Sequence, residues 1–228
     1  ALVPLETAED WSHALAGLTL KNIEATLLVN GQPRQSMFGE MLFTHFGVSG
    51  PIILSMSTLA VDCLSRGRVQ FAINLKPALS VEQLDARLRR DLDQQGKKAI
   101  KNVARGLLPL RLIDPALALA GVPPDKPAHQ ITAEERGRLL AVLRDLRVTV
   151  IRPRPFREAM VTAGGVELKE IEPQTLASRV VEGLYVVGEL LNLHADTGGY
   201  NLQAAFSTGY LAGQAAAERA LRIRGPAE

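Results

Sequence analysis

The sequence has very few of the residues that build covalent cross-links and thiolate metal sites. Cys63 is the only cysteine among 228 residues, which excludes an internal disulfide and favours a cytoplasmic, reducing location. The histidines are scattered along the chain, at His13, His45, His129 and His194. Zinc-binding and iron-binding residue types therefore show no recognisable spacing, and we expect no metal site.

Long apolar runs and a strong net charge are also lacking. No stretch of about 18 apolar residues occurs, so we expect no membrane-spanning helix and no membrane association. The 26 basic and 24 acidic side chains leave a net charge of +2, which gives no general reason to expect nucleic acid as a partner. The chain has no signal peptide and begins without methionine in an apolar segment, which suggests a piece of a longer polypeptide.

Two sequence fingerprints of enzymes are missing. Rossmann-type dinucleotide-binding proteins carry Gly-x-Gly-x-x-Gly after the first strand, with an acidic residue about 20 residues later. This pattern occurs nowhere in the chain. The Gly-x-Ser-x-Gly elbow is absent as well, which disfavours a serine hydrolase.

Hydrophobic periodicity predicts a β-rich beginning. Residues 18–30 alternate apolar and polar side chains and end in Asn30-Gly31, a strong hairpin signal, so residues 35–43 should return as the partner strand. Residues 69–75 predict another strand. Residues 1–78 are therefore expected to be mostly β.

Residues 79–145 are predicted to form a helical block. Ser80 and Thr132 each begin a capping-box pattern that is followed by leucines at helical spacing. Short helices are expected around Pro109 and Pro115. The helical block is therefore inserted into a β framework.

The β character resumes after residue 145. Residues 148–151, 156–161 and 166–171 predict further strands, and residues 184–187 predict a buried strand. A long alanine-rich helix is expected to follow from about residue 201 to 221. The predicted fold class is thus α+β.

The strongest functional motif joins that buried strand to that helix. Gly188-Glu189 ends the strand, and Gly198-Gly199 opens the helix. The first-turn amides of a helix have no partner inside the helix and favour negative charge. A carboxylate at a strand end can accept hydrogen bonds from sugar or ribityl hydroxyls. The motif predicts a site for a polar, phosphate-bearing cofactor; the alternative is a tight turn whose glycines serve packing only.

Two other segments carry candidate site residues. Gly164-Gly165, inside a strand pattern, suggests a bulge or a close approach of the backbone to a ligand. Thr44, His45 and Ser49 could bind substrate or move protons as catalytic residues. A lone histidine beside a serine is more often a structural hydrogen-bonding element, so this second interpretation stays open.

A basic run lies in the helical block. It could bind a nucleotide phosphate or RNA, but acidic residues interleave with it and aromatic residues are missing, so a solvated helix face is favoured. Its members are Arg87, Arg89, Arg90, Lys97, Lys98, Lys101 and Arg105.

Taken together, these motifs resemble the BaiN-like FAD-dependent oxidoreductases, also called the aminoacetone oxidase family of flavoproteins. The resemblance covers most of the chain and rests on residues 1–5, 39–51, 161–166, 170–173, 188–189 and 197–203. Asn192 departs from the family, which usually has an aspartate there. The missing glycine fingerprint belongs to an N-terminal part of the family that this chain does not contain.

The resemblance implies a Rossmann-like FAD domain interrupted by a β-barrel-like substrate domain. Residues 1–78 and 146–172 would form the barrel, residues 79–145 its helical insertion, and residues 173–228 the closing strand and helix of the FAD domain. The implied cofactor-binding residues are Gly164, Gly165, Gly188, Glu189, Gly198, Gly199, Tyr200, Asn201 and Leu202. Among them, Gly188-Glu189 would lie by the ribityl chain and pyrophosphate, and the start of the helix by the pyrimidine edge of the flavin.

The implied activity moves hydride or electrons between an organic small-molecule substrate, FAD and NAD(P)H. We expect the isolated chain to hold little FAD and to be inactive, since the pyrophosphate contacts would be missing. The exposed edge of the strand at 184–187 could support a homodimer. A non-enzymatic module that binds a partner protein or RNA, and a stand-alone enzyme that uses His45, are the alternatives.

Overall fold

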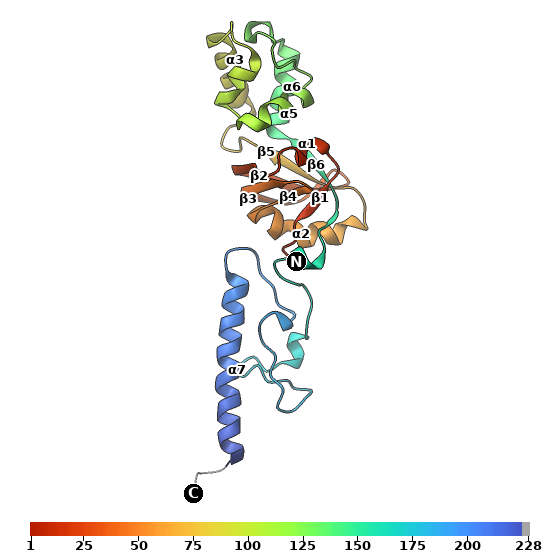
Figure 1. The fold of residues 1–228 in the computed structure, drawn as a ribbon, viewed down its shortest axis with the longest axis vertical. Coiled ribbons are helices and arrows are strands. Elements are labelled where there is room, and N and C mark those ends of the chain that lie inside the picture. The colour runs from red at the N-terminus through yellow and green to blue at the C-terminus, as the bar shows by residue number, and fades with distance from the viewer. Residues whose placement is uncertain (225–228) are drawn as a thin grey trace. The chain divides into compact units, whose positions relative to one another are not determined.

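The chain forms two compact units in a computed structural model that describes residues 1–224 (Figure 1). Residues 4–154 make up the first unit. Residues 1–3 and the chain from Pro155 onward make up the second.

Six strands close into a barrel in the first unit. In spatial order they run β1-β4-β3-β2-β5-β6, and every neighbouring pair is antiparallel. The expected β-barrel domain is therefore confirmed. The strands are β1 (Leu5–Thr7), β2 (Thr19–Val29), β3 (Gln32–Thr44), β4 (Gly47–Ser49), β5 (Val69–Asn74) and β6 (Leu146–Pro153).

The predicted hairpin at Asn30-Gly31 joins β2 to β3. Both turn residues have positive φ, +51° and +77°, as a two-residue type I′ turn requires. Val29 and Gln32 are backbone partners on either side of the turn. Local sequence chemistry thus sets the register of the longest strand pair.

The barrel core is filled by large side chains from alternate strand positions. Leu27, Phe43, Phe71 and Ile73 are fully buried. Helix α2 (Pro51–Leu64), with Pro51 in its first turn, packs against the barrel strands and adds Ile53 and Met56 to the core. The short α1 (Asp10–His13) precedes β2. Figure 1 shows α2 on the opposite side of the strands from the helical block.

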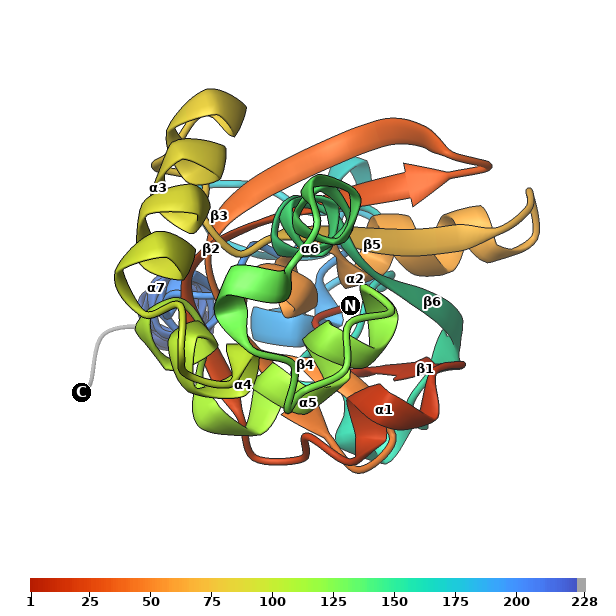
Figure 2. The ribbon, with the colours of Figure 1, turned by 90° about the horizontal axis from the view of Figure 1, so that it is seen from above.

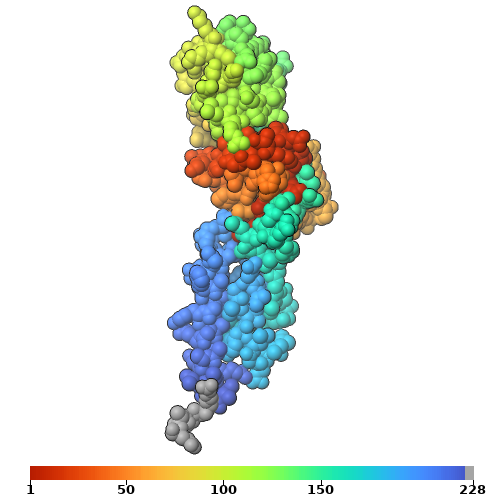
Figure 3. Space-filling view, in the orientation of Figure 1, coloured from red at the N-terminus to blue at the C-terminus, as the bar shows by residue number. Residues whose placement is uncertain are grey.

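The helical block leaves the barrel after β5 and returns at β6. Figure 2 shows its helices in front of the strands, and Figure 3 shows the yellow and green block resting on the orange and red barrel. Its elements are α3 (Val81–Gln94), α4 (Ile100–Val103), η1 (Ala104–Gly106), α5 (Leu110–Leu119), η2 (Ala128–Gln130) and α6 (Ala133–Arg144). The expected insertion is therefore present.

Both predicted capping boxes are confirmed. The Ser80 hydroxyl accepts from the Gln83 amide, and the Gln83 side chain accepts from the Ser80 amide. Thr132 and Glu135 repeat the arrangement at the start of α6. The short helices expected around Pro109 and Pro115 are also present, with Pro109 at the N-cap of α5 and Pro115 inside it.

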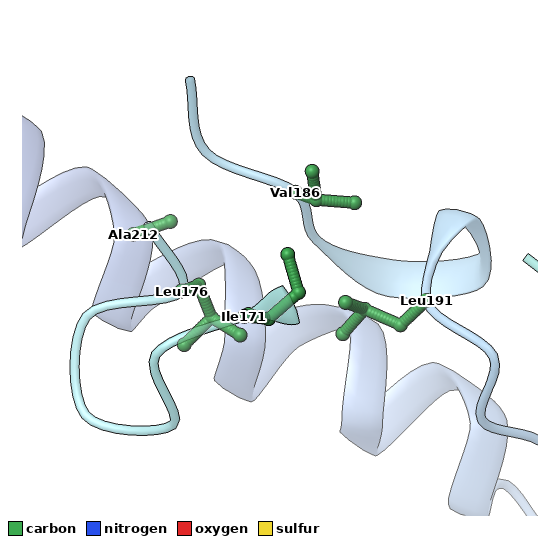
Figure 4. Packing of buried hydrophobic residues seen from close by; sticks show 5 residues of the cluster. All are labelled: Ile171, Leu176, Val186, Leu191 and Ala212. Carbon is green, nitrogen blue, oxygen red and sulfur yellow. The ribbon is translucent and has the colours of Figure 1, made fainter. Parts of the chain in front are cut away.

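The second unit contains little regular structure before its last helix. Three single 3-10 turns, η3 (Phe156–Glu158), η4 (Leu168–Glu170) and η5 (Gly188–Leu190), precede α7 (Tyr200–Arg224), which confirms the predicted long helix. A small core holds these segments against α7 (Figure 4). It consists of Ile171, Leu176, Val186, Leu191 and Ala212.

Three predicted strands of this unit are wrong. Residues 156–158 form η3 instead and residues 159–161 belong to no strand, since Pro155 supplies no amide hydrogen for continued pairing after β6. Residues 166–171 and 184–187 make only isolated bridges, such as Ala177 with Tyr185. A strand needs a neighbour along its length, and the described residues provide none at these places. The sheet edge expected to support a homodimer is accordingly not formed by residues 184–187.

Truncating Phe71 should destabilise the first unit strongly. Replacing this fully buried ring by alanine should cost about 3–5 kcal/mol of unfolding free energy, because the removed atoms leave a cavity. Urea unfolding monitored by the fluorescence of Trp11 measures it, since this single tryptophan packs edge-on against Phe43 with ring centroids 5.9 Å apart. Phe38→Ala is the matched control, because that ring is 65% exposed; an equal loss for both variants would contradict the barrel core.

Candidate cofactor site

The turn η5 is fastened to α7. The Gly188 amide donates to the Thr208 hydroxyl at 2.9 Å, and that hydroxyl donates to the Ala204 carbonyl at 2.7 Å. Gly188 has a φ of +61°, a conformation that glycine adopts without steric cost. Gly188-Glu189, predicted to end a buried strand, thus lies in a 3-10 turn that is held by a threonine two turns into the helix.

One oxygen of the Glu189 carboxylate is already occupied. Its Oε1 accepts from the Thr162 hydroxyl at 2.7 Å and also from the Thr162 backbone amide. These hydrogen bonds hold the pKa of Glu189 below its usual range, because they stabilise the charged form. Glu189 is thus a carboxylate at neutral pH, and within residues 1–224 its Oε2 has no hydrogen-bond donor.

Gly165 approaches the chain's own backbone. A Cβ added there would lie 2.5 Å from the Leu190 carbonyl oxygen. The Val166 amide donates to that same carbonyl at 2.8 Å, and the Asn192 amide donates to the Val166 carbonyl at 2.9 Å. Of this glycine pair, Gly165 thus lies close to the backbone of residues 190–192, whereas Gly164 faces open space.

The start of α7 offers unpaired backbone donors. The helical hydrogen-bond ladder begins with the Gln203 amide donating to the Gly199 carbonyl at 3.0 Å. The amides of Tyr200, Asn201 and Leu202 have no acceptor in the part of the chain that the structure describes. A Cβ added at Gly199 would meet nothing within 4 Å, so the backbone just before these amides is not covered by other described residues.

The Asn201 side chain stabilises the loop before α7. Its Oδ1 accepts from the Ala195 amide and its Nδ2 donates to the Ala195 carbonyl, both at 2.8 Å. Asn201 thus uses one hydrogen bond of each side-chain polar atom on this loop, while its backbone amide has no acceptor among the described residues. Tyr200 and Leu202 are exposed, as is Gly198 before them.

This donor set fits a flavin in part. Free amides at a helix N-terminus suit an anionic group or the electron-rich edge of a reduced ring, and a fixed carboxylate suits sugar or ribityl hydroxyls. Both features belong to the second unit. The described residues show no glycine-rich turn that would bind a pyrophosphate.

The predicted catalytic candidates lie on the β3–β4 hairpin of the barrel. Thr44 ends β3, His45 lies in the turn, and Ser49 ends β4. The exposed His45 ring packs edge-on against Phe46 with centroids 4.9 Å apart. Within residues 1–224 no hydrogen bond joins His45 to Ser49, so the hairpin contains no nucleophile–base pair.

The predicted basic run is largely neutralised. Arg89 pairs with Asp85 at 2.8 Å, Arg90 with Asp91 at 3.0 Å, and Lys101 lies against Asp125. Arg87 pairs with Asp91 at 3.6 Å. Three cations of the run have no carboxylate partner among the described residues: Lys97, Lys98 and Arg105.

Two of these cations line an open cavity in the helical block. The cavity has a volume of about 600 Å³ and lies between the C-terminal end of α3 and η2. The His129 Nδ1 lies 2.6 Å from the Gly96 carbonyl, so this nitrogen carries the hydrogen. The lining residues are Asp93, Gln94, Gln95, Gly96, Lys97, Lys98 and His129.

Residues 1–224 offer neither a cluster of metal ligands nor a membrane-spanning helix. Within residues 1–224, no group of three or more histidine, cysteine, aspartate or glutamate side chains could hold a metal ion. None of the helices in this range is long and apolar enough to cross a membrane.

A match to a family model shows the family to which the chain belongs. Residues 1–161 match the family model described as the HI0933-like protein barrel and H2TH domain. This match takes in the whole barrel and its helical block, which covers well over half of the chain. The chain therefore belongs to the HI0933-like family, and the flavoprotein resemblance inferred from its motifs is confirmed.

Relatives from three bacteria extend the similarity into the second unit. The chain is 34% identical over 220 residues to the 3-dehydro-bile acid delta(4,6)-reductase of Clostridium scindens, covering 96% of this chain and 54% of the relative. It is 33% identical to the ribosomal RNA dihydrouridine synthase of Escherichia coli, and the matched region covers 76% of this chain and 41% of that relative. It is 30% identical to the ribosomal RNA dihydrouridine synthase of Haemophilus influenzae, and the matched region covers 92% of this chain and 49% of that relative. The chain thus spans about half the length of these relatives.

Two residues of the site were not among the sequence-based candidates. Thr162 holds Glu189, and Thr208 holds Gly188. Thr162 lies just before the glycine pair that the sequence singled out, but nothing in the sequence connects it to a residue 27 positions away. Thr208 carries no local signal, because its hydroxyl occupies an ordinary helix position.

Gly165→Ala should open the junction between residues 162–166 and 189–192. Its Cβ would overlap backbone atoms, which must then separate. Hydrogen exchange at the Val166 and Asn192 amides should become faster by at least tenfold, since both donate across this junction. Gly164→Ala is the control, because its φ is also positive but its Cβ would meet nothing within 4 Å; equal exchange in both variants would contradict the close approach.

Proposed function

We propose that this chain is the substrate-side half of a FAD-dependent oxidoreductase. The complete enzyme moves hydride or electrons between an organic substrate, FAD and NAD(P)H. One observation carries the proposal: three amides at the start of α7 have no acceptor among the described residues, in a chain that is 34% identical to a reductase over 96% of its length.

The residues of the second unit would bind and orient the cofactor. The amides of Tyr200, Asn201 and Leu202 would donate to the pyrimidine edge of the flavin and stabilise negative charge there. Glu189 would accept a hydrogen bond from a hydroxyl of the cofactor. FAD itself supplies the redox chemistry, so the absence of a nucleophile–base pair on the β3–β4 hairpin is compatible with this activity.

The exposed apolar side chains of α7 support a unit that packs against further polypeptide. Phe206 is 70% exposed, Tyr210 is 67% exposed, and Leu202 and Leu221 are similarly open. Large apolar side chains that gather on one helix usually mark a contact surface. The half of each relative that lies outside the matched region would supply the missing part of the FAD domain.

Flavin content separates this proposal from its alternatives. The full-length gene product should purify with about one FAD per chain, seen as visible flavin absorbance. Residues 1–228 alone should be almost colourless, because they provide no pyrophosphate-binding turn.

Apo full-length protein incubated with FAD and then dialysed is the control for cofactor lost during purification. A full-length protein that stays colourless after this treatment would contradict the proposal. A strongly yellow 1–228 chain would contradict the predicted division of the site between the two halves.

A second candidate function is oxidoreduction on an RNA substrate. Two relatives are ribosomal RNA dihydrouridine synthases, and both cover most of this chain. The cavity lined by Lys97, Lys98 and His129 would receive RNA phosphates, since these lysines have no carboxylate partner among the described residues.

Charge reversal in this cavity tests the RNA candidate. Lys97→Glu/Lys98→Glu in the full-length protein should weaken binding to a ribosomal RNA fragment and lower the salt slope of log K by roughly 1.4, about 0.7 for each lost phosphate contact. Lys21→Glu/Lys169→Glu changes the net charge equally at exposed positions elsewhere and serves as the control. Equal losses in both variants would show non-specific attraction and eliminate this candidate.

A further inference from the structure

The Glu189 carboxylate is anchored in an asymmetric way. Both Thr162 donors, the hydroxyl at 2.7 Å and the backbone amide, converge on Oε1. The other oxygen, Oε2, receives no donor within residues 1–224. A single residue thus fixes one half of the carboxylate and leaves the other half available as an acceptor.

The backbone on both sides of this contact is also fixed. Gly188 is tied to Thr208 on α7, and the Val166 amide donates to the Leu190 carbonyl at 2.8 Å. Gly165 permits the approach, since a Cβ would overlap the backbone of residues 190–192. The two segments therefore cannot separate without breaking several hydrogen bonds, and the Thr162–Glu189 contact is built into a rigid frame.

The Glu189 side chain lies on an exposed turn and would otherwise sample several rotamers. A group ordered before the ligand arrives loses less entropy on binding and therefore binds more tightly. Because both Thr162 hydrogen bonds go to Oε1, the ordered Glu189 side chain has Oε2 left to accept a hydrogen bond from a ligand.

We infer that Thr162 is a positioning residue that orients the Glu189 carboxylate so that its Oε2 accepts a hydroxyl of a ribityl-bearing or ribose-bearing cofactor. This inference rests on the proposed function. Thr162 itself makes no contact with the cofactor in this arrangement. Its effect on cofactor binding therefore passes entirely through Glu189.

The test uses the full-length flavoprotein and four variants: Thr162→Val, Thr162→Ser, Glu189→Gln and the Thr162→Val/Glu189→Gln double variant. FAD dissociation constants come from quenching of flavin fluorescence, and thermal unfolding of each apo protein is measured alongside. Thr162→Val should raise the dissociation constant roughly tenfold, because it removes one charge-assisted hydrogen bond that orders the carboxylate. Thr162→Ser keeps the hydroxyl and should restore wild-type affinity.

The double variant identifies the route of the effect. Because Thr162 acts through the charged side chain, Thr162→Val should add less than twofold on the Glu189→Gln background. Thr19→Val, at an exposed barrel position, is the matched control and should leave FAD affinity unchanged.

Several results would overturn the inference. It fails if Thr162→Val lowers the apo unfolding temperature but leaves FAD affinity unchanged, which is the result expected of a purely structural contact. It also fails if the losses of the two single variants add fully in the double variant. A wild-type full-length protein that binds no FAD would overturn the proposed function as well, and this outcome is separate because it is seen before any variant is compared.

Discussion

Strand β6 pairs with β5 on one side and with β1 on the other, and this double pairing closes the barrel. The pairing of β1 with β6 joins distant parts of the sequence, since β1 begins at Leu5 and β6 ends at Pro153. Without this closure, β1 and β5 would each present an open edge to solvent. The barrel core around Phe43 and Phe71 depends on this pairing. The strands that carry the helical block depend on it as well.

The elements predicted correctly are those that their own residues specify. Asn30-Gly31 sets a type I′ hairpin, and Ser80 and Thr132 cap their helices with residues three positions away. The strands predicted at 156–161, 166–171 and 184–187 failed for the opposite reason. A segment with strand-like periodicity becomes a strand only if another strand pairs with it, and the local pattern contains no information about that partner.

The candidate site shows the same division. The glycine motifs were visible in the sequence, but their roles differ in space: Gly165 lets two chain segments approach, whereas a Cβ at Gly199 would meet nothing within 4 Å. Sequence spacing alone could not separate these roles, because both motifs are plain glycine pairs. The Thr162–Glu189 contact was likewise invisible, since it joins residues 27 positions apart that meet only in the folded unit.

The attachment of the helical block has a consequence for the barrel. Ile73 and Leu146 are backbone partners on adjacent strands, so the chain departs from the barrel and re-enters it at neighbouring points. A tight connection between β5 and β6 would satisfy the same barrel geometry. A change of length within the block would therefore leave the pairing of β5 with β6, and with it the closure of the barrel, intact.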